Sequence, residues 1–153
     1  MSDSIQLPSN EEIIPSYGYV FIAISPPLNL NFKPRFNFKV PSHWMVAVFN
    51  PIPKKWLTAQ GRQNDARYVL IKGEAAPDNS KFFYVGKFPV SELATVEARI
   101  RSVVPEENSL GEVQFERQYV RDVLKNLVDG GILQEDRARD NFLAAETWSL
   151  QLN

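Results

Sequence analysis

The sequence predicts an α+β fold in which a mostly antiparallel sheet packs against two or three helices within a single domain. In the first half of the chain, short or alternating apolar segments are separated by proline and glycine, which is typical of strands. In the second half, apolar residues recur at the spacing of helices. A length of 153 residues is about that of one domain, and strands followed by helices are typical of α+β folds.

The first half is expected to contain a flexible lead-in followed by strands. Residues 1–16 are polar and contain prolines, so we expect the folded domain to span residues 17–153. From residue 28 to 40, apolar residues occupy the even positions and polar residues most of the odd ones. This pattern predicts a strand, with Pro34 at an edge or at a bend between two pieces. Other apolar runs predict strands at residues 17–24, 43–49, 67–71 and 82–85, with turns at 60–65 and 76–80.

The second half is expected to form helices. A first helix is predicted over residues 91–104, with Ser91 as its N-cap. A second is predicted over residues 109–131, because Ser109 opens a capping box and a Gly-Gly pair ends the apolar stripe. A third is expected over residues 136–147, and the tail at 148–152 is expected to form a closing strand. Basic residues recur every four positions on the polar side of the second helix, at Arg117, Arg121 and Lys125.

Composition excludes several classes of function. The chain has no cysteine and one histidine, so no disulfide, Cys/His dyad or zinc site of the Cys/His kind can form. The acidic residues lack metal-ligand spacing and no glycine-rich phosphate loop is present, so we expect no metal and no cofactor. A net charge of −1 predicts no nucleic-acid partner. Apolar runs of about six residues and a polar start without a signal peptide predict no membrane partner and a cytoplasmic location.

The single histidine, His43, is the main candidate for chemistry near neutral pH. It opens an apolar run that is predicted to be a strand. One interpretation is a strand-end histidine that bonds a backbone group, and the other is a general base or orienting donor at the mouth of a pocket. Ser42 is adjacent, but neighbours in a strand point to opposite faces, which argues against a Ser42–His43 dyad.

Aromatic residues are concentrated in the first half of the chain. Most are expected in the core, and the alternative is an aromatic-lined pocket for an apolar ligand. Lys33, Arg35 and Lys39 alternate with phenylalanines. This alternation puts the charges and the rings on opposite faces of a strand, so we expect a solvated strand face rather than a platform for single-stranded nucleic acid.

Two short motifs resemble those of small permuted papain-like thiol hydrolase domains of a fungal type. One is the run that begins His43-Trp44 and ends at Phe49, and the other is Gln118-Tyr119-Val120 in the second helix. The resemblance covers roughly residues 40–133 and places Arg117 where the family has its nucleophilic thiol, so it implies that covalent thiol catalysis is lost. It implies His43 as a binding or acid/base residue and Gln118 as a polar group of a pocket. An arginine at position 117 would suit an anionic or carbonyl-bearing ligand.

Two functions of different class follow from these observations. The first is a small-molecule-binding domain that catalyses a non-covalent acid/base reaction, such as an isomerisation, cyclisation or addition–elimination, on a largely apolar ligand. Here His43 is the candidate catalytic residue, and Trp44, Arg117, Gln118 and Tyr119 are candidate substrate-binding residues. The second is a non-catalytic protein-interaction module on a degenerate papain-like scaffold. A concave pocket beside His43 favours the first, and a flat exposed aromatic patch favours the second.

Overall fold

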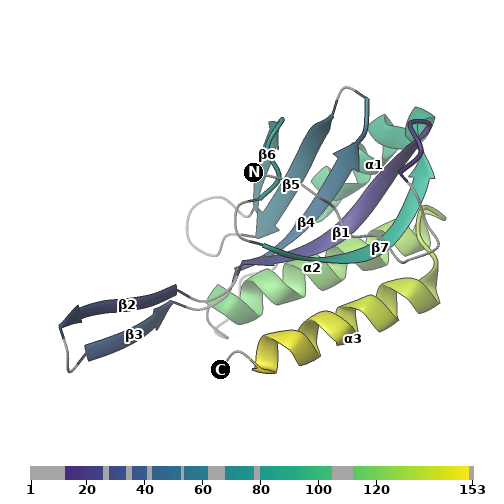
Figure 1. The fold of residues 1–153 in the computed structure, drawn as a ribbon. Helices are drawn as coiled ribbons and strands as arrows, with labels where there is room; N and C mark the ends of the chain where they lie inside the picture. The colour runs from purple at the N-terminus through teal and green to yellow at the C-terminus, as the bar shows by residue number, and fades with distance from the viewer. Residues whose placement is uncertain are drawn as a thin grey trace.

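The computed structural model describes residues 13–25, 28–33, 36–40, 43–52, 54–61, 68–77, 80–104 and 112–151. Its elements confirm the predicted α+β class, with an antiparallel sheet and helices in one domain (Figure 1). The strands are β1 (Tyr17–Ser25), β2 (Leu28–Lys33), β3 (Phe36–Val40), β4 (His43–Asn50), β5 (Lys55–Gly61), β6 (Tyr68–Gly73) and β7 (Lys81–Pro89). The helices are the short 3-10 turn η1 (Val90–Glu92), α1 (Leu93–Ser102), α2 (Glu112–Asp129) and α3 (Glu135–Gln151).

The main sheet has five strands in the order β6-β5-β4-β1-β7, and each neighbouring pair is antiparallel. β5 is not among the strands that the sequence predicts, and its last residues, Gln60 and Gly61, were expected in a turn. The reason is that β5 is buried on both faces: Trp56, Leu57, Thr58 and Ala59 are all buried. A strand covered on both sides does not show the alternation of a half-exposed one.

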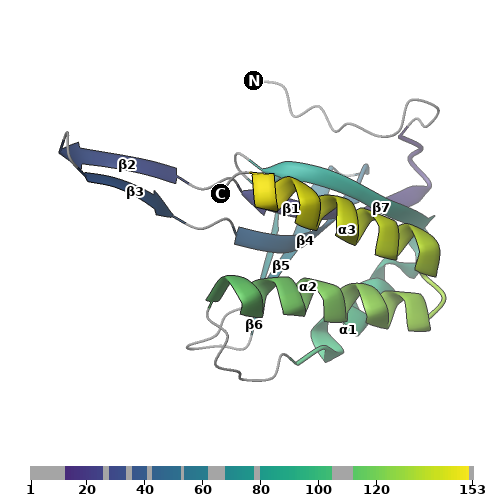
Figure 2. The same ribbon diagram turned by 90° about the horizontal axis from the view of Figure 1, so that it is seen from below.

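Residues 28–40 form two strands rather than one. β2 and β3 pair with each other in a separate two-stranded sheet, in a register that includes Leu30 opposite Phe38. The hairpin extends away from the main body in both ribbon views (Figures 1 and 2). Of the two alternatives that the sequence left open, an edge or a bend between two pieces, the structure therefore shows two pieces. Pro34 itself lies outside the described residues, as do the first twelve residues of the expected lead-in.

The helices differ from the prediction at their ends. Ser91 lies in η1, and the residue that caps α1 is Glu92, without a side-chain hydrogen bond. Ser109, the expected cap of the second helix, lies outside the described residues. The expected closing strand at residues 148–152 is wrong, because α3 continues to Gln151. Trp148 continues the inward stripe of α3, with its ring 5.9 Å from that of Phe83 on β7, so packing against the sheet favours the helix.

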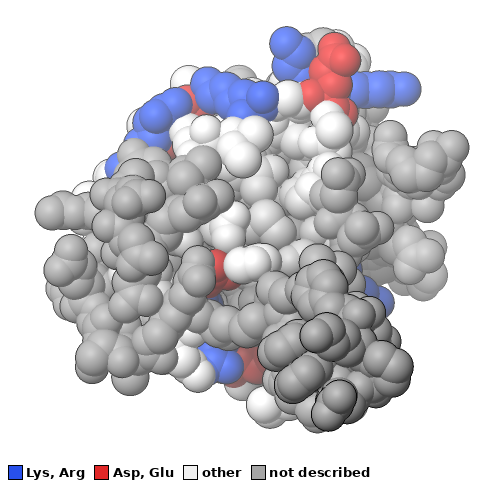
Figure 3. All heavy atoms as spheres, turned by 90° about the vertical axis from the view of Figure 1, so that its left-hand side faces the viewer, with Lys and Arg blue, Asp and Glu red and all other residues white. Residues whose placement is uncertain are grey.

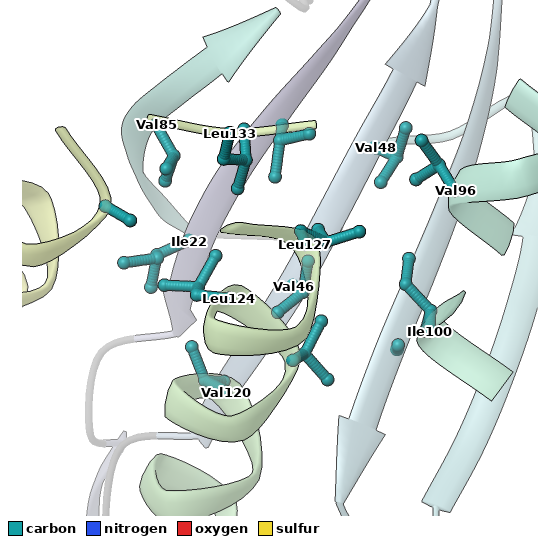
Figure 4. Packing of buried hydrophobic residues seen from close by; sticks show 14 of the residues in the cluster. Ile22, Val46, Val48, Val85, Val96, Ile100, Val120, Leu124, Leu127 and Leu133 are labelled. Atoms are coloured by element: carbon teal, nitrogen blue, oxygen red, sulfur yellow. The ribbon is translucent and has the colours of Figure 1, made fainter. Parts of the chain in front are cut away.

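One face of the sheet packs against the helices. Figure 4 shows Ile22, Val46 and Val48 of the sheet beside side chains of α1 and α2. α2 lies across β4 and β5, and α3 lies along β7 and β1. All three helices contribute to this core, which contains Val96 and Ile100 of α1, Val120, Leu124 and Leu127 of α2, and Ala138 and Ala145 of α3.

The other face of the sheet carries a second apolar cluster that is rich in aromatic rings. Tyr19, Phe21, Ala23, Ala47, Phe49, Trp56 and Tyr84 are buried there, and Phe82 and Met45 pack against them partly buried. The rings of Phe49 and Trp56 are 4.8 Å apart between centroids, within the range of favourable aromatic pairs. Most described aromatic residues of the first half are thus core residues, as predicted. Along the described chain, no helix combines the length and the apolar composition that crossing a membrane requires.

Candidate functional site

His43 is the first residue of β4 and pairs with Ser25, the last residue of β1. Its backbone N–H donates to the Ser25 hydroxyl oxygen at 3.2 Å, which fixes the backbone where the two strands separate. The imidazole is only half-buried, with 40% of the side chain exposed. The single histidine therefore lies at the start of β4 with part of its ring exposed to solvent.

The partner of His43 is Glu116, a residue of α2 whose side chain is completely buried. The Nδ1 atom of His43 lies 2.9 Å from Glu116 Oε2 and 3.2 Å from Oε1. The backbone N–H of Trp44 donates to Oε1 at 3.0 Å, and the Gln60 side-chain amide donates to Oε2 at 3.2 Å. One carboxylate thus joins β4, β5 and α2 through hydrogen bonds.

The fold brings these groups together from distant parts of the sequence. The β4–β5 register places Val46 opposite Ala59, so Gln60 lies beside Met45, close to the start of β4. Glu116 stands on the inward face of α2, one turn before Val120, in a stripe that continues through buried apolar residues. Because α2 crosses β4 and β5, this inward position delivers the carboxylate to the end of both strands.

A buried carboxylate is costly unless hydrogen bonds compensate the loss of water. Glu116 has its three donors but no lysine or arginine partner among the described residues. With Nδ1–H donating to the carboxylate, neutral His43 presents an unprotonated Nε2, and protonated His43 presents an Nε2–H donor. A carboxylate that fixes the tautomer and the orientation of an imidazole in this way is the arrangement that acid–base enzymes use.

Apolar side chains lie next to His43 on the same face of the sheet. His43 and Met45 are two residues apart in β4 and therefore share a face. Ala23 pairs with Met45 on one side and with Phe82 on the other. This row is the edge of the aromatic cluster on the second face, and Phe82 packs against Trp56 with centroids 5.5 Å apart.

The end of the sheet that carries His43 faces the viewer in Figure 3, which looks at the molecule from the left-hand side of Figure 1. In the middle of this view the described surface is mostly uncharged, and lysine and arginine side chains gather along its upper edge.

The structure brings only part of the predicted site together. Trp44 contributes its backbone N–H to Glu116, but its indole is buried in the core, 5.4 Å from the ring of Phe142. Tyr119 is also completely buried, beside Gly61 of β5. These two candidate substrate-binding side chains fill the interior.

Arg117 and Gln118 point elsewhere. Arg117 is hydrogen-bonded to Gln114 and lies 3.8 Å from Glu146 of α3. Gln118 is exposed and donates to Asp122 at 2.9 Å. Successive residues of a helix are rotated by about 100°, so the inward position of Glu116 turns the next two residues away from His43.

Glu116 and Gln60 are not among the site residues that the sequence predicts. The signal for Glu116 was present, because a charged residue at an inward position of an amphipathic helix needs a buried partner. Gln60 carried no such signal, because β5 itself was not recognised. Among the described residues, no group of three His, Asp or Glu side chains forms a metal site.

Comparison with protein families, with curated proteins and with solved structures finds no match to this chain. The functional argument therefore depends on the geometry of the site.

Proposed function

We propose that this protein binds a small, largely apolar molecule and that His43, oriented by Glu116, catalyses a cofactor-independent acid/base reaction on it. The reaction would be an isomerisation, a cyclisation or an addition–elimination, in which a proton moves between the ligand and Nε2 of His43. No covalent bond to the protein is required, in keeping with the absence of cysteine from the chain.

The single observation that supports this proposal is the pairing of a completely buried carboxylate with a half-exposed imidazole at 2.9 Å. A histidine that served only to satisfy Glu116 would be expected to be buried with it. Here Nδ1 is engaged and Nε2 makes no hydrogen bond with any described residue. The imidazole thus has one nitrogen held by the protein and one available to a ligand.

The surroundings of His43 support a largely apolar ligand. The neighbouring row on the sheet consists of Met45, Ala23 and Phe82, and it belongs to the aromatic cluster of the second face. A net charge of −1 also supports a ligand other than nucleic acid. For the same reason we propose no nucleic-acid partner. We also propose that the protein has no membrane partner and a cytoplasmic location.

Deuterium exchange tests the proposal directly. A base that abstracts a proton next to a carbonyl group exchanges that proton in deuterated water, so a panel of aliphatic and aromatic ketones can be followed by proton NMR. We expect exchange by the wild-type protein on at least one ketone and a fall of about a hundredfold or more in His43→Gln. Glu116→Gln should also slow exchange, because the amide no longer favours Nδ1–H.

Lys55→Gln is the matched control, because Lys55 is exposed at the end of β5 opposite to Gln60. It should exchange ketones at the wild-type rate. His43→Gln should remain folded, with its melting temperature within a few degrees of wild type, since much of the ring lies in solvent. Equal exchange by wild type and His43→Gln would contradict the proposal, and a large loss of stability with unchanged exchange would assign the histidine to structure alone.

A further inference from the structure

We propose that the groove between α2 and α3 is a second ligand site, which takes a small apolar molecule with one anionic head group, such as a medium-chain carboxylate. The proposal does not depend on the chemistry of His43. It uses the groove and the row of basic residues on α2 that the sequence shows but that the His43 site leaves unexplained.

The groove has the size and the floor of a ligand pocket. Its volume is about 350 Å³, and its floor includes Leu124, Val128, Ala138 and Phe142. Pockets that hold small molecules have volumes of about 300–1,000 Å³ and mostly apolar walls. Leu143 lies at the edge of the groove and is 53% exposed, which leaves an apolar surface open to an apolar tail.

A basic side chain lies on the rim of this apolar floor. Arg117, Arg121 and Lys125 follow each other at four-residue spacing, and like charges at this spacing repel one another. Arg117 lies 3.8 Å from Glu146, and Lys125 lies 3.7 Å from Asp129. Arg121 lines the groove and forms no ion pair with the described residues. Its planar guanidinium is suited to a carboxylate, which it can bind through two hydrogen bonds.

The acidic residues that line the groove indicate which of its ends would take the anionic head group. Glu146 is paired with Arg117 and Asp129 with Lys125, whereas Glu135, which follows the turn that joins α2 to α3, forms no ion pair with the described residues. Arg121 is eight residues before Asp129, or about 12 Å along the helix axis. An anion is therefore repelled at the turn and attracted near Arg121, so we place the head group at Arg121 and the tail along Leu124 and Val128.

Three probes with the same tail and different head groups test the site: decanoate, decanol and decyltrimethylammonium, each below its micelle concentration. Binding is measured by titration calorimetry, and the site is located by amide chemical shifts of α2 and α3. We expect decanoate to bind most tightly and the cation most weakly. Arg121→Gln should weaken decanoate about tenfold, as for loss of a charged hydrogen bond, and leave decanol unchanged.

Matched variants separate the groove from nonspecific binding. Arg101→Gln removes an exposed cation of α1 that does not line the groove and should leave decanoate binding unchanged. Leu143→Ser should weaken all three probes, whereas Leu150→Ser should not, because Leu150 is an exposed leucine of α3 outside the groove.

Several results would overturn the proposal. They are the absence of decanoate binding, equal affinity for decanoate and the cation, or an unchanged affinity in Arg121→Gln. A dimer in sedimentation experiments that Leu143→Ser dissociates would also overturn it, because the groove would then be covered by a second copy of the chain.

Discussion

Replacing Glu116 with alanine is expected to lower the free energy of unfolding by about 3 kcal/mol. The largest contribution comes from the backbone N–H of Trp44, which donates to Glu116 at 3.0 Å in a fully buried place. A buried donor left without an acceptor costs about 1–3 kcal/mol. The lost side-chain carbons add about 0.8 kcal/mol per methylene. Release of a buried charge offsets part of this loss.

Glu116→Gln is the control that keeps the shape of the side chain. Its amide oxygen can still accept from Trp44, and its NH₂ group can donate to Nδ1 of His43 in the other tautomer and to the carbonyl of a rotated Gln60. Because every hydrogen bond can re-form, we expect a loss of only about 1 kcal/mol.

Urea unfolding followed by circular dichroism measures both variants, with the free energy extrapolated linearly to zero denaturant. The two variants should differ by about 2 kcal/mol, since only alanine leaves the Trp44 amide without an acceptor. The reasoning would be refuted if Glu116→Ala lost less than about 1 kcal/mol, or if the glutamine variant lost as much as the alanine variant.

Three further predictions concern the fold. Leu124 is 3% exposed, so Leu124→Ala should cost about 2–5 kcal/mol in urea unfolding; a loss below about 0.5 kcal/mol would place it outside the core. Gly131 has φ 77°, so Gly131→Ala should cost about 1 kcal/mol. Gly73→Ala is the control, because a Cβ at Gly73 meets nothing within 4 Å, and it should cost little. Equal melting temperatures of Gly131→Ala and Gly73→Ala would contradict this reasoning. The Lys72 hydrogen bond lowers the pKa of the Glu97 carboxyl against the opposing effect of burial. The contribution of the ionised Glu97 carboxyl to the free energy of unfolding is therefore complete above about pH 4.3, the pKa of an unperturbed glutamate. It is lost as the pH falls through the lower pKa of the folded state. In Glu97→Gln, the free energy of unfolding should no longer show this fall at acidic pH. The same pH dependence in wild type and Glu97→Gln would contradict a stabilising role of the ion pair.

The sequence predicted the fold class because the signals involved are local. The apolar run of β1 and the inward stripe of α2 each arise within one segment, where the spacing of side chains reports which face is buried. The closing strand was wrong for the complementary reason. Apolar and polar residues alternate over residues 148–152, which locally fits a strand, but the contact of Trp148 with Phe83 favours continuation of α3.

The candidate site was predicted only in part. His43 could be singled out because it is the one histidine of the chain. The resemblance drew attention to the segment that contains Glu116, but it assigned roles to Arg117 and Gln118, which the helix turns toward Glu146 and Asp122. An inward-facing glutamate signals a buried partner without identifying that partner.

The sequence by itself determined the secondary structure of most segments, the single histidine and the absence of thiol chemistry. The tertiary structure decided which groups meet. His43 and Glu116 are 73 residues apart in the chain, and Gln60 is 56 residues from Glu116. Their contacts depend on the β4–β5 register and on the place where α2 crosses the two strands. Local periodicity specifies the face on which a side chain lies, whereas the partner across that face is set by the packing of whole elements.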